Sequence, residues 1–151
     1  MVDQSDVGRS FAPVTAYVEP RRLRCFLQAQ NEINQIYRAE KAAHDSGYSA
    51  VPIPPTYLFC LQMLDNESPY EFLDELQIEA ARVLHGEQSF SYHAPVVVGD
   101  TVTIVSTVAD VAVKAAGSLT RVVIESNIRN QHGVHVADTF CTIIVRNGVA
   151  L

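Results

Sequence analysis

Residues 54–64 read PPTYLFCLQML, and this stretch decides the fold that the sequence predicts. Proline is favoured at the first position of a helix, where its missing N–H has no intrahelical partner to lose. The pattern therefore predicts a helix from Tyr57 to Leu64. Gln62 is its only strongly polar residue, and a helix without a polar face is typical of a position that is buried nearly all round.

The second half of the chain predicts strands that can enclose this helix. Apolar and polar residues alternate over residues 121–129, and a similar alternation over residues 102–113 predicts one strand or a bulged pair. Turn-like AAGS and QHG segments follow these strands, and residues 139–146 supply the last strand. We therefore expect an α+β fold of one domain over residues 1–151, in which an antiparallel sheet wraps around the central apolar helix.

Two further helices are predicted before the strands. Glu19-Pro20 begins the first, with apolar residues at helical spacing from Leu23 onward, and three arginines near its start are expected on its solvated face. Ser68-Pro69-Tyr70-Glu71 matches a capping box, which predicts a short amphipathic helix up to about Arg82.

Composition narrows the range of partners. The chain has 151 residues, 48% of them hydrophobic, and a net charge of -6, which argues against nucleic acid or an anionic membrane as a partner. The first ten residues do not resemble a secretory signal, and no apolar run approaches the ~20 residues of a membrane span, so we expect a cytoplasmic protein. The three cysteines lack a C-x-x-C spacing and are expected to be buried thiols.

Several segments resemble, in the same order, the FAS1-like dehydratase or MaoC N-terminal branch of the hot-dog fold. They are AYVEPRRLRCFLQAQNE, PPTYLF and LHGEQSFSYHAPVVVGDTV. The resemblance implies a sheet around a central helix and pairing with a second hot dog into one continuous sheet. It also implies an acyl thioester, carried on coenzyme A or a carrier protein, and reversible hydration at the 2,3 bond of an (R)-3-hydroxyacyl group, without a further cofactor.

The resemblance also indicates where acid–base residues would lie. Active members carry an aspartate and a histidine in a Gly-Asp-x-Asn-Pro-aliphatic-His run, and the matching run here is NEINQIY, with Glu32 and Tyr37 at those two positions. A phenol with a pKa near ~10 is a poor substitute for an imidazole near ~6.5. The degenerate pair suggests a non-catalytic half of a two-hot-dog enzyme. Two alternatives are a weak pair with Tyr37 as acid and Glu32 as base, and residues that merely end a helix.

Candidate substrate-binding residues lie at two further places. The free backbone N–H groups of Thr56 and Tyr57, at the start of the central helix, can hold a thioester carbonyl, although Thr56 can equally be a simple cap. His85 and Gly86 begin a strand that the resemblance places at the tunnel mouth; alternatively, they are a sheet-edge histidine and a bulge.

No metal site is predicted. His135 and Asp138 have an odd spacing along one strand, which places them on opposite faces, and His132 falls in a hairpin turn. Cys60 lies in the apolar helix without a basic neighbour and is expected to be structural.

Three functions are therefore open. The first is an acyl-thioester-binding subunit of a hydratase or dehydratase that works with a catalytic hot-dog partner. The second is a self-sufficient homodimeric hydratase or thioesterase, although Gln62 alone offers a polar group on the central helix, which counts against hydrolysis. The third is a non-enzymatic acyl-binding module. In each case a free sheet edge favours a dimer, with itself or with another chain.

Overall fold

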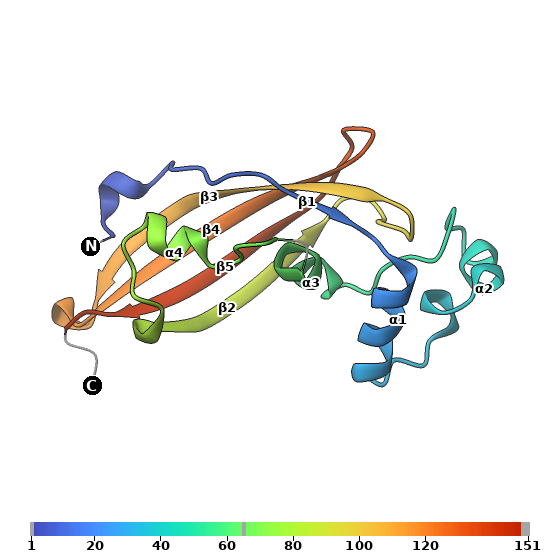
Figure 1. Ribbon diagram of the computed structural model, residues 1–151, viewed down its shortest axis with the longest axis horizontal. Coiled ribbons are helices and arrows are strands. Elements are labelled where there is room, and N and C mark those ends of the chain that lie inside the picture. The colour runs from blue at the N-terminus through green and yellow to red at the C-terminus, as the bar shows by residue number, and fades with distance from the viewer. Residues whose placement is uncertain (1, 65, 149–151) are drawn as a thin grey trace.

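The computed structural model describes residues 2–64 and 66–148. A curled antiparallel sheet of five strands in the order β1-β3-β4-β5-β2 covers helix α3 (Tyr57–Leu64) (Figure 1). Helices α3 and α4 (Glu71–Glu75) lie over the same face of the sheet, called here the inner face, while α1 (Pro20–Ala29) and α2 (Glu40–Asp45) lie beyond one end of it. The predicted α+β hot-dog fold is confirmed, with the central helix at the predicted residues.

The strands follow the predicted alternation. Their bounds are β1 (Val14–Tyr17), β2 (Val83–Tyr92), β3 (Thr101–Lys114), β4 (Leu119–Asn130) and β5 (His135–Arg146). The alternation over 102–113 belongs to one strand, β3, whose register with β4 shifts between Val108 and Asp110. Strand β1 was not predicted, because four residues are too few to show a period of two.

The sequence predicted the starts of the helices better than their ends. Helix α1 begins at Pro20, where the Glu19 carboxylate accepts a hydrogen bond from the Arg22 N–H at 2.8 Å. The helix predicted from Ser68 to Arg82 is wrong: α4 has five residues, and its N-cap Tyr70 makes no side-chain cap bond. Gln77 then adopts a left-handed φ of 55°, which ends helical continuation. Single 3-10 turns occur at η1 (Gln4–Asp6), η2 (Gln35–Tyr37), η3 (Ala80–Arg82) and η4 (Ala115–Gly117).

Helix α3 is buried on one flank only. Tyr57, Leu58 and Leu61 are at most 1% exposed and pack in the larger core cluster with α1 and the sheet. By contrast, Phe59 is 37% exposed, and Met63 is half-buried. The expectation of burial nearly all round is therefore wrong, because the second flank of the helix faces a cavity instead of the core.

Two smaller expectations concern the burial of the cysteines and the length and apolarity of the helices. Cys25 is exposed on the polar side of α1, contrary to the prediction, while Cys60 and Cys141 are half-buried. Burial raises the pKa of both half-buried thiols, which disfavours a nucleophilic thiolate. Among the helices of residues 2–64 and 66–148, none combines the length and apolarity that a membrane span requires.

Candidate functional site

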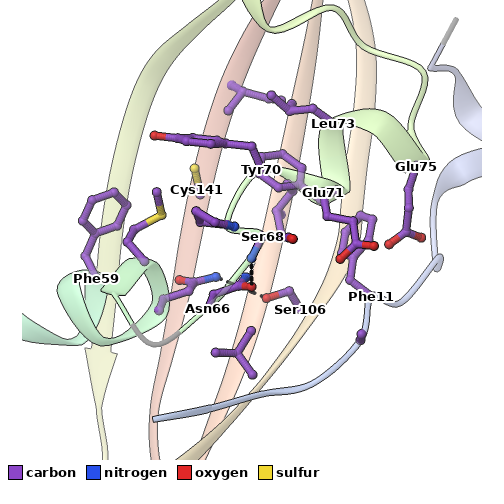
Figure 2. Close-up of a pocket in the computed structure, with 18 of the residues that line it drawn as sticks. Phe11, Phe59, Asn66, Ser68, Tyr70, Glu71, Leu73, Glu75, Ser106 and Cys141 are labelled. Atoms are coloured by element: carbon purple, nitrogen blue, oxygen red, sulfur yellow. Dashed lines mark hydrogen bonds between the residues drawn. The ribbon is translucent and has the colours of Figure 1, made fainter.

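A cavity of about 310 Å³ lies between the open flank of α3, helix α4 and the inner face of the sheet (Figure 2). Its walls are largely apolar, which suits a hydrocarbon chain, and its volume falls at the lower end of the range for small-molecule sites. Its lining includes Phe59, Gln62 and Met63 of α3, His85 of β2, and Ser106 of β3.

The floor of this cavity carries a small polar group that the sequence did not single out. Gln62 Nε2 donates to Ser106 Oγ at 3.3 Å and to Ser126 Oγ at 3.4 Å, and the two serine hydroxyls lie 2.8 Å apart. Ser106 and Ser126 are directly opposite each other on β3 and β4, and Ser126 is buried. The signal was present in the sequence, since Ser126 interrupts a run of inward-facing valine and isoleucine.

His85 lies in the wall of the cavity, on the edge strand β2. Its ring centroid is 6.1 Å from that of Phe59, with the rings tilted by 57°, and its Nε2 is 3.4 Å from Gln88 Oε1. Gly86 has a different role in the fold. It is the bulged residue at which the pairing of β2 with β5 shifts, and a Cβ there would approach Thr142 O and Ile144 Cγ1 to 3.3 Å each.

The two candidate donors at the start of α3 differ. The Tyr57 N–H donates to the Pro54 carbonyl at 3.0 Å, so it is not free, contrary to the expectation. Thr56 is exposed, and its N–H has no backbone acceptor among the described residues. The Tyr92 hydroxyl donates to the Pro55 carbonyl and ties the end of β2 to this tip of the helix.

Glu32 and Tyr37 lie on the loop after α1. The Glu32 carboxylate accepts a hydrogen bond from the Asn34 N–H at 2.8 Å, which occupies it locally. Tyr37 is half-buried, and its pKa is raised first by burial, then by the negative charge of Glu32 and by Tyr48. The phenol is therefore moved further from the neutral range in which an acid–base group works well.

The predicted site residues are thus not in one place. Tyr37 lines a separate hollow of about 340 Å³ at the tip of α3, together with Pro55 and Leu58. Of the other predicted residues, His85 lines the cavity of about 310 Å³ beside α3, while Glu32, Thr56, Tyr57 and Gly86 line neither. Tyr37 and Glu32 interact electrostatically, but the cavity of about 310 Å³ is on a different side of α3.

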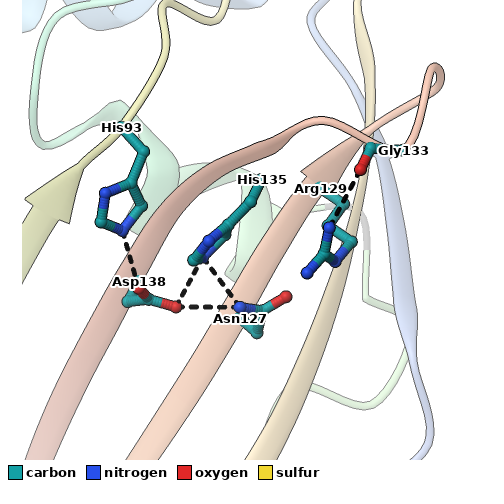
Figure 3. A network of polar contacts seen from close by, with 6 residues as sticks. All are labelled: His93, Asn127, Arg129, Gly133, His135 and Asp138. Carbon is teal, nitrogen blue, oxygen red and sulfur yellow. Dashed lines mark hydrogen bonds and ion pairs between the residues drawn. The ribbon is translucent and has the colours of Figure 1, made fainter.

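The prediction that His135 and Asp138 lie on opposite faces is wrong. His135 Nε2 is 2.8 Å from Asp138 Oδ1 on the outer face of the sheet (Figure 3). A register shift leaves Val136 as an extra residue in β5, since Ile128 pairs with Ala137 but Arg129 pairs with His135. Both Val136 and Ala137 are consequently buried, and the two polar residues that flank them share the outer face.

Asp138 also accepts hydrogen bonds from His93 and Asn127. Burial alone would raise the pKa of its carboxyl. The hydrogen bonds from His93, His135 and Asn127 together outweigh that effect and hold the pKa below its usual value.

Comparisons with known proteins agree with this architecture. Two UPF0336 proteins align over nearly the whole chain: one from Streptomyces avermitilis is 31% identical over 146 residues, covering 96% of this chain and 95% of its own, and one from Leifsonia xyli subsp. xyli is 34% identical over 140 residues, covering 92% of each.

Solved structures show the same fold at lower identity. The crystal structure of the C-terminally truncated HadBC (3R-hydroxyacyl-ACP dehydratase) complex from Mycobacterium tuberculosis has a TM-score of 0.79 and 22% identity, covering 94% of this chain and 99% of the other. The ChsH1-ChsH2 complex from the same organism has a TM-score of 0.73 and 19% identity, covering 93% and 87%.

The family assignment depends on a match over most of the chain. Residues 5–139 match the family described as FAS1-like, dehydratase domain region, and they include α1, α3 and most of the sheet. The chain therefore belongs to the FAS1-like dehydratase domain family of hot-dog proteins.

Proposed function

We propose that this chain is the acyl-thioester-binding, non-catalytic subunit of a two-chain hot-dog (R)-3-hydroxyacyl dehydratase or enoyl hydratase. The observation that carries the proposal is the cavity of about 310 Å³ along the open flank of α3. A soluble fold buries the apolar side of such a helix unless the space has another occupant, and an acyl chain matches its apolar walls.

The reaction needs a base for the α-proton and an acid for the leaving hydroxyl, and the equivalent positions here are poorly suited to both roles. Glu32 is held by the Asn34 N–H, and the pKa of Tyr37 is raised above its usual value. No imidazole stands at either position. These features favour a partner chain as the source of the aspartate and the histidine.

The place for that partner is the outer edge of β2. This strand ends the sheet, and no strand of residues 2–64 or 66–148 pairs with its outer edge. Leu84 and Tyr92, both on β2, are 50% and 46% exposed and give this strand apolar surface that a partner can cover. His85 on the same strand lines the cavity, so a second hot dog docked there would extend the cavity wall across the interface.

Two of the structures with this fold are complexes of two different chains, HadBC and ChsH1-ChsH2. This agrees with a hot-dog partner for the present chain. HadBC is a 3R-hydroxyacyl-ACP dehydratase, which supports a carrier-linked acyl thioester as the substrate class here.

The test measures hydration of crotonyl-coenzyme A and of a crotonyl carrier protein. The loss of the enoyl absorbance reports the rate. We expect the purified chain alone to give no more than the uncatalysed rate. Co-expression with a hot-dog chain that carries an intact aspartate and histidine, such as one encoded in a neighbouring reading frame, should yield an active complex. Replacing the partner's histidine by alanine should remove that activity.

Acyl binding is tested separately from turnover. Met63→Trp places a large ring in the cavity, while Val113→Trp places one at an exposed position on β3. We expect the first variant to lose retention of a long-chain acyl thioester in native mass spectrometry, and the second to keep it. Robust turnover by the lone chain that disappears in Glu32→Gln or Tyr37→Phe would contradict the proposal. Retained ligand without activity in any pairing would favour an acyl-binding module.

A further inference from the structure

A second site is assembled on the outer face of the sheet from His93, His135, Asp138 and Asn127 (Figure 3). His93 follows the end of β2, His135 and Asp138 lie on β5, and Asn127 lies opposite Asp138 on β4. The hairpin of β4 and β5 thus contributes three of the residues, and His93 comes from a segment at least 34 positions earlier in the chain. The bulge at Val136 is what brings the two β5 residues onto the same face.

The potential ligand atoms are close together. His93 Nε2 is 2.8 Å from Asp138 Oδ2, His135 Nε2 is 2.8 Å from Asp138 Oδ1, and the donor atoms of the three residues all lie within 4.8 Å of one another. The two imidazole centroids are 4.4 Å apart. Ligand atoms around a tetrahedral zinc ion are separated by about 3.3 Å, given bonds of about 2.0 Å, so small side-chain shifts bring these atoms to that geometry.

With Asp138 ionised, no position of the imidazole proton satisfies every contact in this cluster. His135 Nε2 lies 2.8 Å from Asn127 Nδ2 and 2.8 Å from Asp138 Oδ1, and those two atoms are 3.0 Å apart. If the ring nitrogen is protonated, it meets the amide donor; if it carries a lone pair, it meets the carboxylate oxygen. Turning the Asn127 amide around brings two oxygen acceptors together instead. A cation resolves the conflict, because it accepts both the imidazole lone pair and the carboxylate.

The exposure of the cluster to solvent also suits a bound metal ion. The side chains of His93, His135 and Asp138 are 42%, 32% and 18% exposed. Asp138 is therefore the most buried of the three side chains, while both histidine side chains are more accessible to water. Three protein ligands with an open fourth position are typical of sites where zinc keeps a water molecule.

We propose that His93, His135 and Asp138 bind one divalent transition-metal ion of the zinc class, with water at the remaining position. Two nitrogen ligands and one oxygen ligand suit Zn²⁺, Co²⁺ or Ni²⁺, and disfavour Mg²⁺, which prefers oxygen ligands. The ion connects His93, which follows edge strand β2, to strand β5. It lies close to the hydrogen bond between Tyr92 and the Pro55 carbonyl at the tip of α3. The site lies outside the cavity of about 310 Å³, although His93 also lines the hollow at the tip of α3.

The test uses the full chain without a histidine tag, freed of metal with a chelator and titrated with ZnCl₂ against a chromophoric zinc indicator. We expect one Zn²⁺ per chain, with affinity lowered at least about 100-fold in His93→Ala and in Asp138→Asn. His132→Ala is the matched control, because His132 lies in the adjacent hairpin turn outside the cluster, and it should bind zinc as the parent does. Excess MgCl₂ should not displace the ion.

Two further measurements keep the test decisive if Asp138→Asn folds poorly. Co²⁺ should give the strong visible absorption of a tetrahedral site in the parent chain and lose it in His93→Ala, whose exposed position makes a folding defect easy to exclude by circular dichroism. Added Zn²⁺ should raise the melting temperature of the parent but not of His93→Ala. Absence of stoichiometric binding in the parent, or equal affinity in His93→Ala and His132→Ala, would overturn the site.

Discussion

The two sides of helix α3 differ in what they contain. Along its open flank, the cavity has largely apolar walls and a partly buried hydrogen-bonded group of Gln62, Ser106 and Ser126. At its N-terminal tip, the loop with Glu32 and Tyr37 has a carboxylate that serves as a local cap and a phenol with a raised pKa. Under the proposed function, binding and acid–base chemistry are separate in this fold, because this chain keeps the binding cavity and a partner supplies the acid and the base.

The largest expected effect contrasts the packed flank of α3 with the open one. Leu61→Ala removes a side chain that is 1% exposed within the core and should lower the free energy of unfolding by about 3 kcal/mol. Met63→Ala enlarges a cavity that already exists and should cost about 1 kcal/mol or less. Urea unfolding of both variants measures the difference. Equal losses would mean that the open flank is part of the core.

The next prediction tests whether the hydrogen bonds of Gln62 to Ser106 and Ser126 affect the affinity of the cavity for an acyl thioester. Gln62→Leu removes two long hydrogen bonds but leaves the 2.8 Å contact between the serines, so stability should change by less than about 1 kcal/mol. A saturated acyl thioester should bind about fourfold tighter, the effect of roughly one additional buried methylene. Isothermal titration with a saturated acyl-coenzyme A measures this. Gln28→Leu, on the exposed side of α1, should leave the affinity unchanged.

The regions of the molecule also differ in how well the sequence predicted them. Helix α3 was predictable from its proline-led apolar run, and strand β4 from a period of two that no extra residue interrupts. The open flank of α3 was not, since the residues Phe59 and Met63 are apolar whether they meet a core or a cavity. Only the packing of distant segments distinguishes those two environments.

The outer face of the sheet was mispredicted for a specific reason. A period of two assigns His135 and Asp138 to opposite faces, but one extra residue at Val136 reverses the assignment for everything beyond it. A bulge of this kind has no composition signal, because Val136 and Ala137 are ordinary strand residues. His93 was missed for a similar reason: its partners are 42 and 45 positions away along the chain.

A smaller effect concerns the contact between the helix tip and β2. Burial raises the pKa of Tyr92 to about 12, and its hydroxyl donates to the Pro55 carbonyl. Because the folded pKa lies above the usual ~10, the fold favours the neutral phenol. This contribution is complete below pH 10 and is lost as the pH rises through 12.

The matching variant is Tyr92→Phe. Near pH 8 it should be less stable than the parent by about 1 kcal/mol, because the hydrogen bond is absent, and the gap should shrink above pH 10. Melting temperatures across that range measure the gap. Tyr70→Phe, at a 61% exposed position, should follow the parent at every pH. A gap for Tyr92→Phe that stays constant to pH 12 would contradict burial of this phenol.

The smallest expected effect is the sharpest test of the comparison. In the active two-chain complex, Glu32→Gln and Tyr37→Phe should each leave turnover within about twofold of the parent, because proton transfer is assigned to the partner. Removing the Tyr37 hydroxyl also leaves its ring in the core cluster, so the fold should be kept. If either variant instead lowers kcat by more than about tenfold, which a general acid or base would do, the tip of α3 takes part in the chemistry. The separation of binding from catalysis would then fail at the residue identified.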